Sequence, residues 1–195
     1  MRTIRAAVNN AALFGPTRDA AEARVRVVAG LSILSAGTPM FVMGEEICAQ
    51  RVYKYDNVRT SREDILGERQ GHGANLFRYY QDVIRLSRGS RAIRSRNIDI
   101  IRASDDNRVI AFTRREGTTQ ELVIASLNNR PFADGYVMHS TVDRLPPGGW
   151  QEIFNSDSHF CGGSDLGNYS ATLLCHDGRI EVRLPANGLI VLRGV

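Results

Sequence analysis

The chain has 195 residues, of which 43% are hydrophobic and 24% charged, and its formal net charge is +4. This composition excludes an intrinsically disordered chain and supplies enough apolar surface for one or two folded cores. Basic side chains outnumber acidic ones before residue 95 and are outnumbered after it, which favours a domain boundary near Ser95. The arginines of the first half are spread along predicted helices without interleaved aromatics, so they indicate a solvated helix face rather than contact with nucleic acid.

The number and spacing of the cysteines indicate a reducing compartment and argue against a cysteine-ligated metal site. They form an odd set without metal-type spacing, namely Cys48, Cys161 and Cys175. Such a set is typical of a reducing cytoplasm rather than of a disulfide framework or a zinc site. The segment Val27–Met43 is uncharged, but Gly37 and Pro39 interrupt it, and it is shorter than the about 20 residues of a membrane-spanning helix. We therefore expect a cytoplasmic chain that has no membrane span, cofactor or metal.

The first elements in chain order are two helices. Apolar residues at helical spacing predict a short amphipathic helix over residues 3–13, which Gly15-Pro16 then stops. A second helix is predicted from about Arg18 to Ser35. Thr17 is its candidate N-cap, and Gly37 marks its end.

A buried strand, a loop and a third helix are expected next. The continuous apolar run Met40–Met43 predicts a parallel strand that is covered on both faces and paired at both edges. Residues 45–73 form a long irregular segment, and loops of that length are usually functional or disordered. A helix is then predicted from Asn75, as N-cap, to about Ser87, with Gly89 at its end. Its apolar stripe consists of Leu76, Phe77, Tyr80, Val83 and Ile84.

The periodicity changes to short β-type runs beyond Asn97. The predicted strands are Ile98–Arg102, Val109–Arg114, Leu122–Leu127, Gly135–Val142, Trp150–Phe154, Ile180–Leu184 and Leu189–Leu192. Turn signals such as Glu116-Gly117 and Asn187-Gly188 separate them. Strands with this spacing predict an antiparallel sandwich of about 100 residues. Trp150 opens one of these runs, so we expect it to pack in the core or at a sheet edge.

Three segments resemble the α-amylase family, glycoside hydrolase family 13. Ala36–Ile47 resembles the eighth strand and following loop of its (β/α)₈ barrel. Gly148–Asp157, followed by the glycines at 162–163 and Gly167-Asn168, resembles the late loop of its C-terminal all-β domain. Leu184–Leu192 resembles the closing strand of that domain. The last two segments are most similar to 1,4-α-glucan branching enzymes, which rebuild α-1,6 links in glycogen or starch.

The resemblance implies an α+β chain of two parts. Residues 1–95 correspond to the last units of a barrel, and residues 96–195 correspond to the antiparallel β-sandwich. The family's catalytic carboxylates follow the fourth, fifth and seventh barrel strands, and a His-Asp pair precedes the eighth. Residues 1–71 contain no histidine, so no catalytic residue of this glycosyltransferase and glycoside hydrolase family is carried over. We expect the chain to be inactive alone.

Glu45 and Glu46 do not replace the missing carboxylates. Retaining chemistry needs two carboxyl groups about 5–5.5 Å apart on either side of the scissile bond, whereas adjacent side chains at a strand end point in different directions. In barrels of this type the loops after the strands form the substrate cleft. The resemblance therefore implies that Glu45, Tyr53, Tyr55 and Asp56 contact the hydroxyl groups or ring faces of an α-glucan such as glycogen or starch.

Three functions remain open from the sequence. The chain is the C-terminal portion of an α-glucan-remodelling enzyme, with a structural or weak glucan-binding role; or an autonomous, non-catalytic carbohydrate-binding or interaction protein; or one part of a split enzyme whose barrel a second chain completes. An isolated parallel strand leaves backbone groups unpaired, and each buried unpaired group costs about 1–3 kcal/mol. We therefore expect self-association through the barrel-facing surfaces of residues 18–47 and 75–88.

Overall fold

The computed structural model describes residues 2–51, 63–140 and 145–195. The helical elements are α1 (Thr3–Ala6), α2 (Gly15–Leu34), η1 (Glu45–Ile47), α3 (Ile65–Glu68), α4 (Ala74–Gly89), α5 (Arg91–Arg94) and η3 (His159–Cys161), of which η1 and η3 are 3₁₀ turns. The strands are β1 (Ile98–Ser104), β2 (Val109–Glu116), β3 (Thr119–Ser126), β4 (Phe132–His139), β5 (Gly148–Asn155), β6 (Thr172–Cys175), β7 (Arg179–Leu184) and β8 (Gly188–Gly194). All seven predicted strands are present, and β6 was not predicted.

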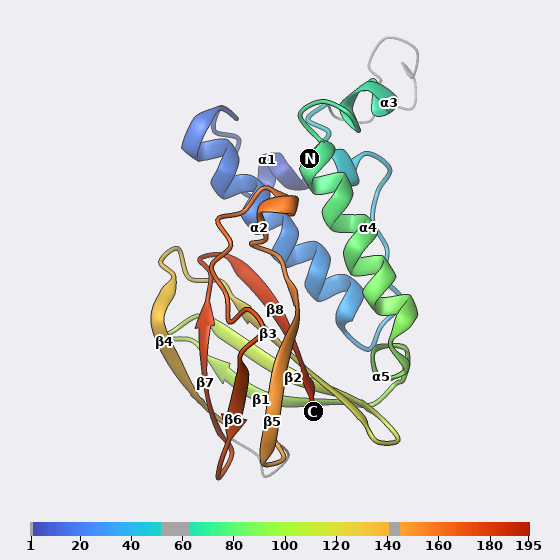
Figure 1. Ribbon diagram of the computed structural model, residues 1–195. Helices are drawn as coiled ribbons and strands as arrows, with labels where there is room; N and C mark the ends of the chain where they lie inside the picture. Colours follow the sequence, from blue (N-terminus) through green and yellow to red (C-terminus); the bar gives the residue numbers. More distant parts are fainter. Residues whose placement is uncertain (1, 52–62, 141–144) are drawn as a thin grey trace.

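The strands form two antiparallel sheets. Six pair in the order β1-β2-β3-β8-β5-β6, and β4 pairs with β7 in a separate ribbon (Figure 1). The hairpin between β2 and β3 pairs Glu116 with Thr119, and Gly117 in its turn has a φ of 59°. That positive φ is what a two-residue turn between antiparallel strands requires. The predicted antiparallel arrangement is confirmed.

One hydrophobic core lies between the two sheets. Trp150 of β5 is 1% exposed there, which confirms that it packs in the core. The other members of this core come from both sheets and include Ile101, Leu122, Met138, Ile180 and Leu192. Inward-facing residues of two packed sheets form such a core because each sheet must bury one apolar face.

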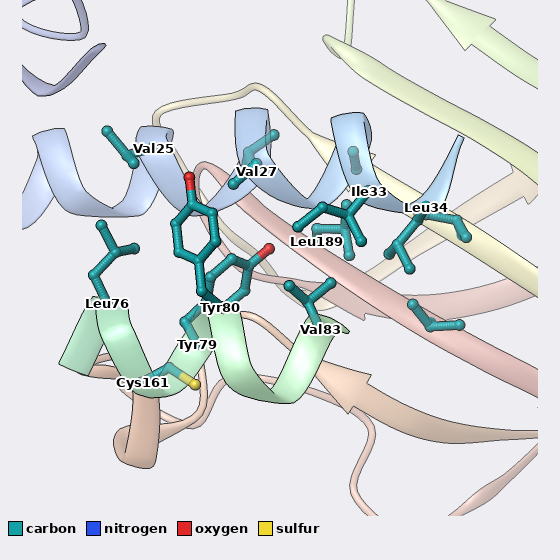
Figure 2. Close-up of a cluster of buried hydrophobic side chains, with 14 of the residues drawn as sticks. Val25, Val27, Ile33, Leu34, Leu76, Tyr79, Tyr80, Val83, Cys161 and Leu189 are labelled. Atoms are coloured by element: carbon teal, nitrogen blue, oxygen red, sulfur yellow. The ribbon is translucent and has the colours of Figure 1, made fainter. Parts of the chain in front are cut away.

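The second core covers the other face of the six-stranded sheet. Helices α2 and α4 pack side by side on this face (Figure 1). Figure 2 shows the apolar side chains of α4 directed toward α2, with Leu189 of β8 behind them: Leu76, Tyr79, Tyr80 and Val83. Because helices cover one face and the β4–β7 ribbon covers the other, Leu122–Ser126 of β3 is buried at every position instead of alternating.

The helix starts differ from the sequence prediction. Helix α2 begins at Gly15, with Phe14 as its N-cap and Pro16 in its first turn, so Thr17 is not the cap. Proline is favoured in the first turn, where the N–H that it lacks has no intrahelical partner. The helix predicted over residues 3–13 ends at Ala6. The chain then turns through Asn9 and Asn10, whose φ angles of 53° and 63° are left-handed.

Helix α4 also starts earlier than predicted. Gly73 is its N-cap, and Asn75 lies inside its first turn. A Cβ on Gly73 would lie 2.7 Å from the Ile47 carbonyl oxygen, so the helix start depends on a close backbone approach that the sequence pattern does not reveal. Tyr79, absent from the predicted stripe, is fully buried, and its hydroxyl donates to the Arg26 carbonyl oxygen at 2.6 Å.

The predicted strand Met40–Met43 does not form. Residues 40–42 have no regular secondary structure and Met43 lies in a turn, and the four side chains are 88%, 43%, 57% and 60% exposed in chain order. Of these four side chains, Phe41 contacts an aromatic ring of the described chain: its ring centroid lies 5.0 Å from that of Tyr80. A strand requires neighbouring backbone, and every strand of the described chain lies in the two sheets beyond residue 97. The barrel remnant is therefore not confirmed.

The proposed division between residues 1–95 and 96–195 falls between α5 and β1. The helices and the six-stranded sheet share the second core, which contains Val25 and Val83 together with Val123 and Val191. The division stays a prediction. Among the described helices, none combines the length and apolarity needed to cross a bilayer.

Candidate functional site

The candidate site begins at the turn that follows the exposed segment. Gly44 and Cys48 flank η1, and both have left-handed φ angles, 95° and 56°. The Ala49 amide donates to the Gly44 carbonyl oxygen at 2.8 Å and closes the turn. A Cβ on Gly44 would lie 2.8 Å from that of Ala49, so glycine permits both the φ angle and the close contact.

The two glutamates of this turn have different partners. Glu45 accepts a hydrogen bond from the Thr3 hydroxyl at 2.7 Å, which ties the turn to α1. Glu46 is 8% exposed, accepts from the Gly44 amide at 2.7 Å and lies 3.7 Å from an Arg69 guanidinium nitrogen. Each carboxylate therefore anchors the turn to its own surroundings, as expected for adjacent side chains.

The other three predicted sugar contacts, Tyr53, Tyr55 and Asp56, lie outside the described residues, so their juxtaposition with Glu45 stays a prediction. The described residues on either side of this segment are joined by Glu63, whose carboxylate accepts hydrogen bonds from the amides of Gln50 and Arg51 at 2.6 Å and 2.7 Å.

A charged hollow of about 500 Å³ lies beside the turn. It is lined by Arg5, Arg18, Ile47, Cys48, Ala49, Gln50, Arg51, Glu63, Glu68 and His72. Arg18 pairs with Glu22 at 2.7 Å and donates to the His72 carbonyl oxygen at 3.2 Å. Burial, with a smaller contribution from Glu22, raises the pKa of the Cys48 thiol, so this cysteine is a protonated and poor nucleophile. This hollow therefore offers hydrogen-bonding groups rather than a nucleophile. Within the described ranges, no group of histidine, cysteine and carboxylate side chains is arranged to hold a metal ion.

A second hollow, of about 680 Å³, lies between α4 and the loop that follows β5. Phe160 of η3 lies in its lining and is 57% exposed. Arg78, Asp82 and Arg85 of α4 face it from the other side. None of these residues was predicted from the sequence as part of a site. The sequence shows here a single aromatic residue, Phe160, in a loop that contains serine, aspartate and glycine. No helical or strand periodicity indicates where its side chain lies.

The loop between β5 and β6 is held by a partly buried carboxyl group. Glu152 accepts hydrogen bonds from the amide and the side chain of Asn168, both at 2.9 Å, and from the Asn155 side chain at 3.2 Å. Burial raises its pKa, and the hydrogen bonds from Asn168 and Asn155 oppose that rise. A Cβ on Gly167 would lie 2.8 Å from a Glu152 carboxylate oxygen. Gly167 and Asn168, which resemble the family in this loop, are therefore the residues that hold the loop in place by close packing and hydrogen bonds.

The part of the chain that forms the sheets matches a known domain family. Residues 100–195 match the family described as the α-amylase, C-terminal all-β domain. This half of the chain therefore belongs to that domain family, and the chain corresponds to the C-terminal region of α-amylase-family enzymes.

Curated relatives narrow the comparison to one kind of enzyme. The chain is 26% identical over 163 residues to the 1,4-alpha-glucan branching enzyme GlgB of Bradyrhizobium sp. (strain BTAi1 / ATCC BAA-1182), over 80% of this chain and 22% of the relative. It is 35% identical over 95 residues to the GlgB of Marinobacter nauticus, over 44% of this chain and 14% of the relative. The chain thus spans less than a quarter of the length of these relatives.

Solved structures agree on the fold. The α-amylase of Geobacillus thermoleovorans, complexed with acarbose, superposes with a TM-score of 0.68 at 14% identity, over 99% of this chain and 36% of that structure. The α-amylase of H. orenii gives a TM-score of 0.62 at 20% identity, over 91% of this chain and 36% of that structure. At these identities the likeness shows the fold alone. Its coverage includes the helical half as well as the sheets.

Proposed function

We propose that this chain is the C-terminal part of an α-glucan-remodelling enzyme of the branching type. Its sheets support an α-amylase-type barrel, and the catalytic carboxylates lie in barrel strands outside residues 1–195. The chain alone is inactive toward glycosidic bonds. Three free, buried cysteines support the cytoplasm as its compartment. In the complete enzyme Glu45, Tyr53, Tyr55 and Asp56 contact the glucan.

The observation that carries this proposal is the exposure of Met40–Met43. Four consecutive apolar side chains, between 43% and 88% exposed, lie on a segment that pairs with no strand among the described residues. Contiguous exposed apolar surface of this kind marks an interaction site. Because this segment resembles the eighth barrel strand, we propose that it pairs in the barrel of the complete enzyme, where strands bury side chains on both faces.

The relatives supply the substrate class. One branching enzyme matches over 80% of this chain and one α-amylase structure matches over 99%, so both comparisons extend into the helical half that contains Met40–Met43. Proteins of these names act on α-glucans, so an α-1,4-glucan is the substrate that we propose for the complete enzyme.

A chimera tests the proposal. The Bradyrhizobium branching enzyme would be truncated to remove the region that this chain matches, and the chain would be joined in its place. Branch points formed on amylose would be measured by the fall in iodine absorbance and by debranching of the product. We expect branching from the chimera and none from the truncated relative or from this chain alone.

A matched pair of chimeras shows whether the exposed segment is responsible. Met40→Asp with Val42→Asp should abolish branching, because the charges oppose burial in a barrel. Leu174→Asp, which replaces an equally apolar and 75% exposed side chain on β6, should leave branching intact. Branching by the isolated chain, or an inactive chimera with native circular dichroism, would overturn the proposal.

A further inference from the structure

The hollow between α4 and η3 lies on a different side of α4 from Met40–Met43. Figure 1 shows the chain after α2 running along one side of α4, while η3 contacts α4 on the other. A partner that covers Met40–Met43 therefore leaves this hollow open. Its lining includes Arg78, Asp82 and Arg85 of α4 and Phe160 and Cys161 of η3.

Phe160 is an exposed aromatic ring on a rigid support. Its centroid lies 3.9 Å from that of the His159 ring. Asp165 fixes His159 twice, since its carboxylate accepts from the His159 amide and lies against the ring Nδ1, both at 2.7 Å. These hydrogen bonds hold the pKa of the Asp165 carboxyl below its usual range, so the carboxylate that fixes His159 is ionised at neutral pH.

A buried arginine holds the other end of η3. Arg26 is 3% exposed, and its guanidinium donates to the Cys161 carbonyl oxygen at 3.1 Å. Gly162 follows with a φ of 82°, and a Cβ there would lie 2.8 Å from the side-chain nitrogen of Asn75. The position of Phe160 is therefore set before any ligand arrives, and little conformational entropy is lost when one binds.

The opposite wall offers donors and an acceptor. Arg78, Asp82 and Arg85 lie on one face of α4, four and three residues apart. Arg85 pairs with Asp82 at 2.5 Å, and both side chains are accessible. Arg78 has no hydrogen-bond or ion-pair partner in the part of the chain that the structure describes. Its guanidinium fork is free to donate to two neighbouring oxygens of a ligand.

This combination matches the surface of a pyranose. One face of a glucosyl ring presents C–H groups that pack on an aromatic ring, and its hydroxyl groups donate and accept at the rim. The arginines supply hydrogen-bond donors, and Asp82 between them supplies an acceptor. The negative charge of Asp82 disfavours an anionic ligand. The volume of about 680 Å³ lies within the usual range for small-ligand sites.

We propose that this hollow is an α-glucan contact site separate from the catalytic cleft of the complete enzyme. A glucosyl unit packs on Phe160 and is hydrogen-bonded by Arg78 and Asp82. The site holds the polymer near the enzyme without acting on it. This inference rests on the proposed function, which supplies an α-glucan as the ligand.

Affinity electrophoresis of the full chain in native gels that contain glycogen tests the site. The retardation of the chain gives a dissociation constant for glycogen. Phe160→Ala should raise that constant about threefold to tenfold, the range of an aromatic contact, and Phe160→Tyr should restore it. Arg78→Ala should also weaken binding. Phe14→Ala, which removes a 72% exposed ring outside the hollow, should have no effect. Equal retardation of the wild type, Phe160→Ala and Arg78→Ala, or no retardation of the wild type, would overturn the inference.

The two proposals fail in different ways. The branching chimera assayed on short, soluble amylose does not depend on the hollow, so its activity tests only the proposed function. Normal branching together with glycogen binding that is insensitive to Phe160 would remove only the contact site. An inactive chimera together with glycogen retardation that depends on Phe160 would remove only the proposed function.

Discussion

The guanidinium group of Arg114 donates to the carbonyl oxygen of Leu34, the last residue of α2. The same side chain is completely buried and donates to three more carbonyl oxygens, those of Ile93 at 2.7 Å, Ser95 at 2.5 Å and Asn97 at 3.1 Å. One arginine of β2 thus satisfies the ends of α2 and α5 and the start of β1. It joins the helical half to the sheet.

Arg114→Met should therefore destabilise the whole chain. The methionine fills much of the space but leaves buried carbonyl groups without donors, and each such group costs about 1–3 kcal/mol. We expect the free energy of unfolding to fall by about 3–5 kcal/mol in urea titrations followed by Trp150 fluorescence. Arg115→Met is the control, because that side chain is 41% exposed and pairs with Asp99, an arrangement worth less than about 1 kcal/mol. Equal losses in the two variants would refute the joining role of Arg114.

Glu152 should make stability depend on pH in a specific direction. Burial raises its folded-state pKa, so the folded chain keeps this proton at pH values where the unfolded chain has lost it. The free energy of unfolding therefore falls as pH rises from the ordinary glutamate pKa to the raised one. Glu152→Gln removes this term. We expect wild type to lose stability relative to the variant as pH rises upward from about 4, the ordinary range of a glutamate pKa, measured by urea denaturation at each pH. A difference that stays constant as pH rises would show that the folded-state pKa is not raised.

The exposed run Met40–Met43 predicts self-association of the isolated chain. Burial of this surface in a second copy releases about 25 cal/mol per Å² of apolar area. Sedimentation equilibrium should show an average mass that rises with concentration up to high micromolar. Met40→Lys with Val42→Lys should keep the chain monomeric and as heat-stable as wild type, whereas Leu174→Lys on β6 should still associate. A wild type that is monomeric at every concentration would contradict the prediction.

The local sequence pattern was sufficient to predict the strands of the two sheets, but not the structure of the helical half. Strands β1 to β5, β7 and β8 were predictable because short β-type runs alternate with turn residues such as Gly117, whose positive φ the hairpin uses. Strand β6 has four residues and follows a long loop, so no period marks it. At Met40–Met43 the apolar run was recognised correctly, yet strand formation depends on backbone partners that sequence pattern cannot supply.

The candidate site shows the same limit. The sequence indicated Glu45, but its partner Thr3 is 42 residues away and belongs to another element. The hollow beside Phe160 arises where α4 meets η3, about 80 residues further along the chain. Such sites depend on long-range packing, and only the resemblance to a family brought residues of the Gly44 loop into consideration.

The glycines of the β5–β6 loop give the last prediction. A Cβ on Gly163 would lie 2.1 Å from the Asp157 carbonyl oxygen and 2.3 Å from its carbon, and both are backbone atoms that cannot rotate away. Gly163→Ala must therefore shift the loop, which also disturbs the hydrogen bond from the Leu166 amide to the Asp157 carboxylate at 3.1 Å. We expect the free energy of unfolding to fall by about 2 kcal/mol or more.

Gly89→Ala is the matched control, because a Cβ on this last residue of α4 meets no atom within 4 Å. Alanine lowers the entropy of the unfolded chain and suits a helix, so this variant should be neutral or more stable by up to about 1 kcal/mol. Urea denaturation monitored at Trp150 measures both variants. Equal effects at the two positions would mean that the close approach at Gly163 does not constrain the loop.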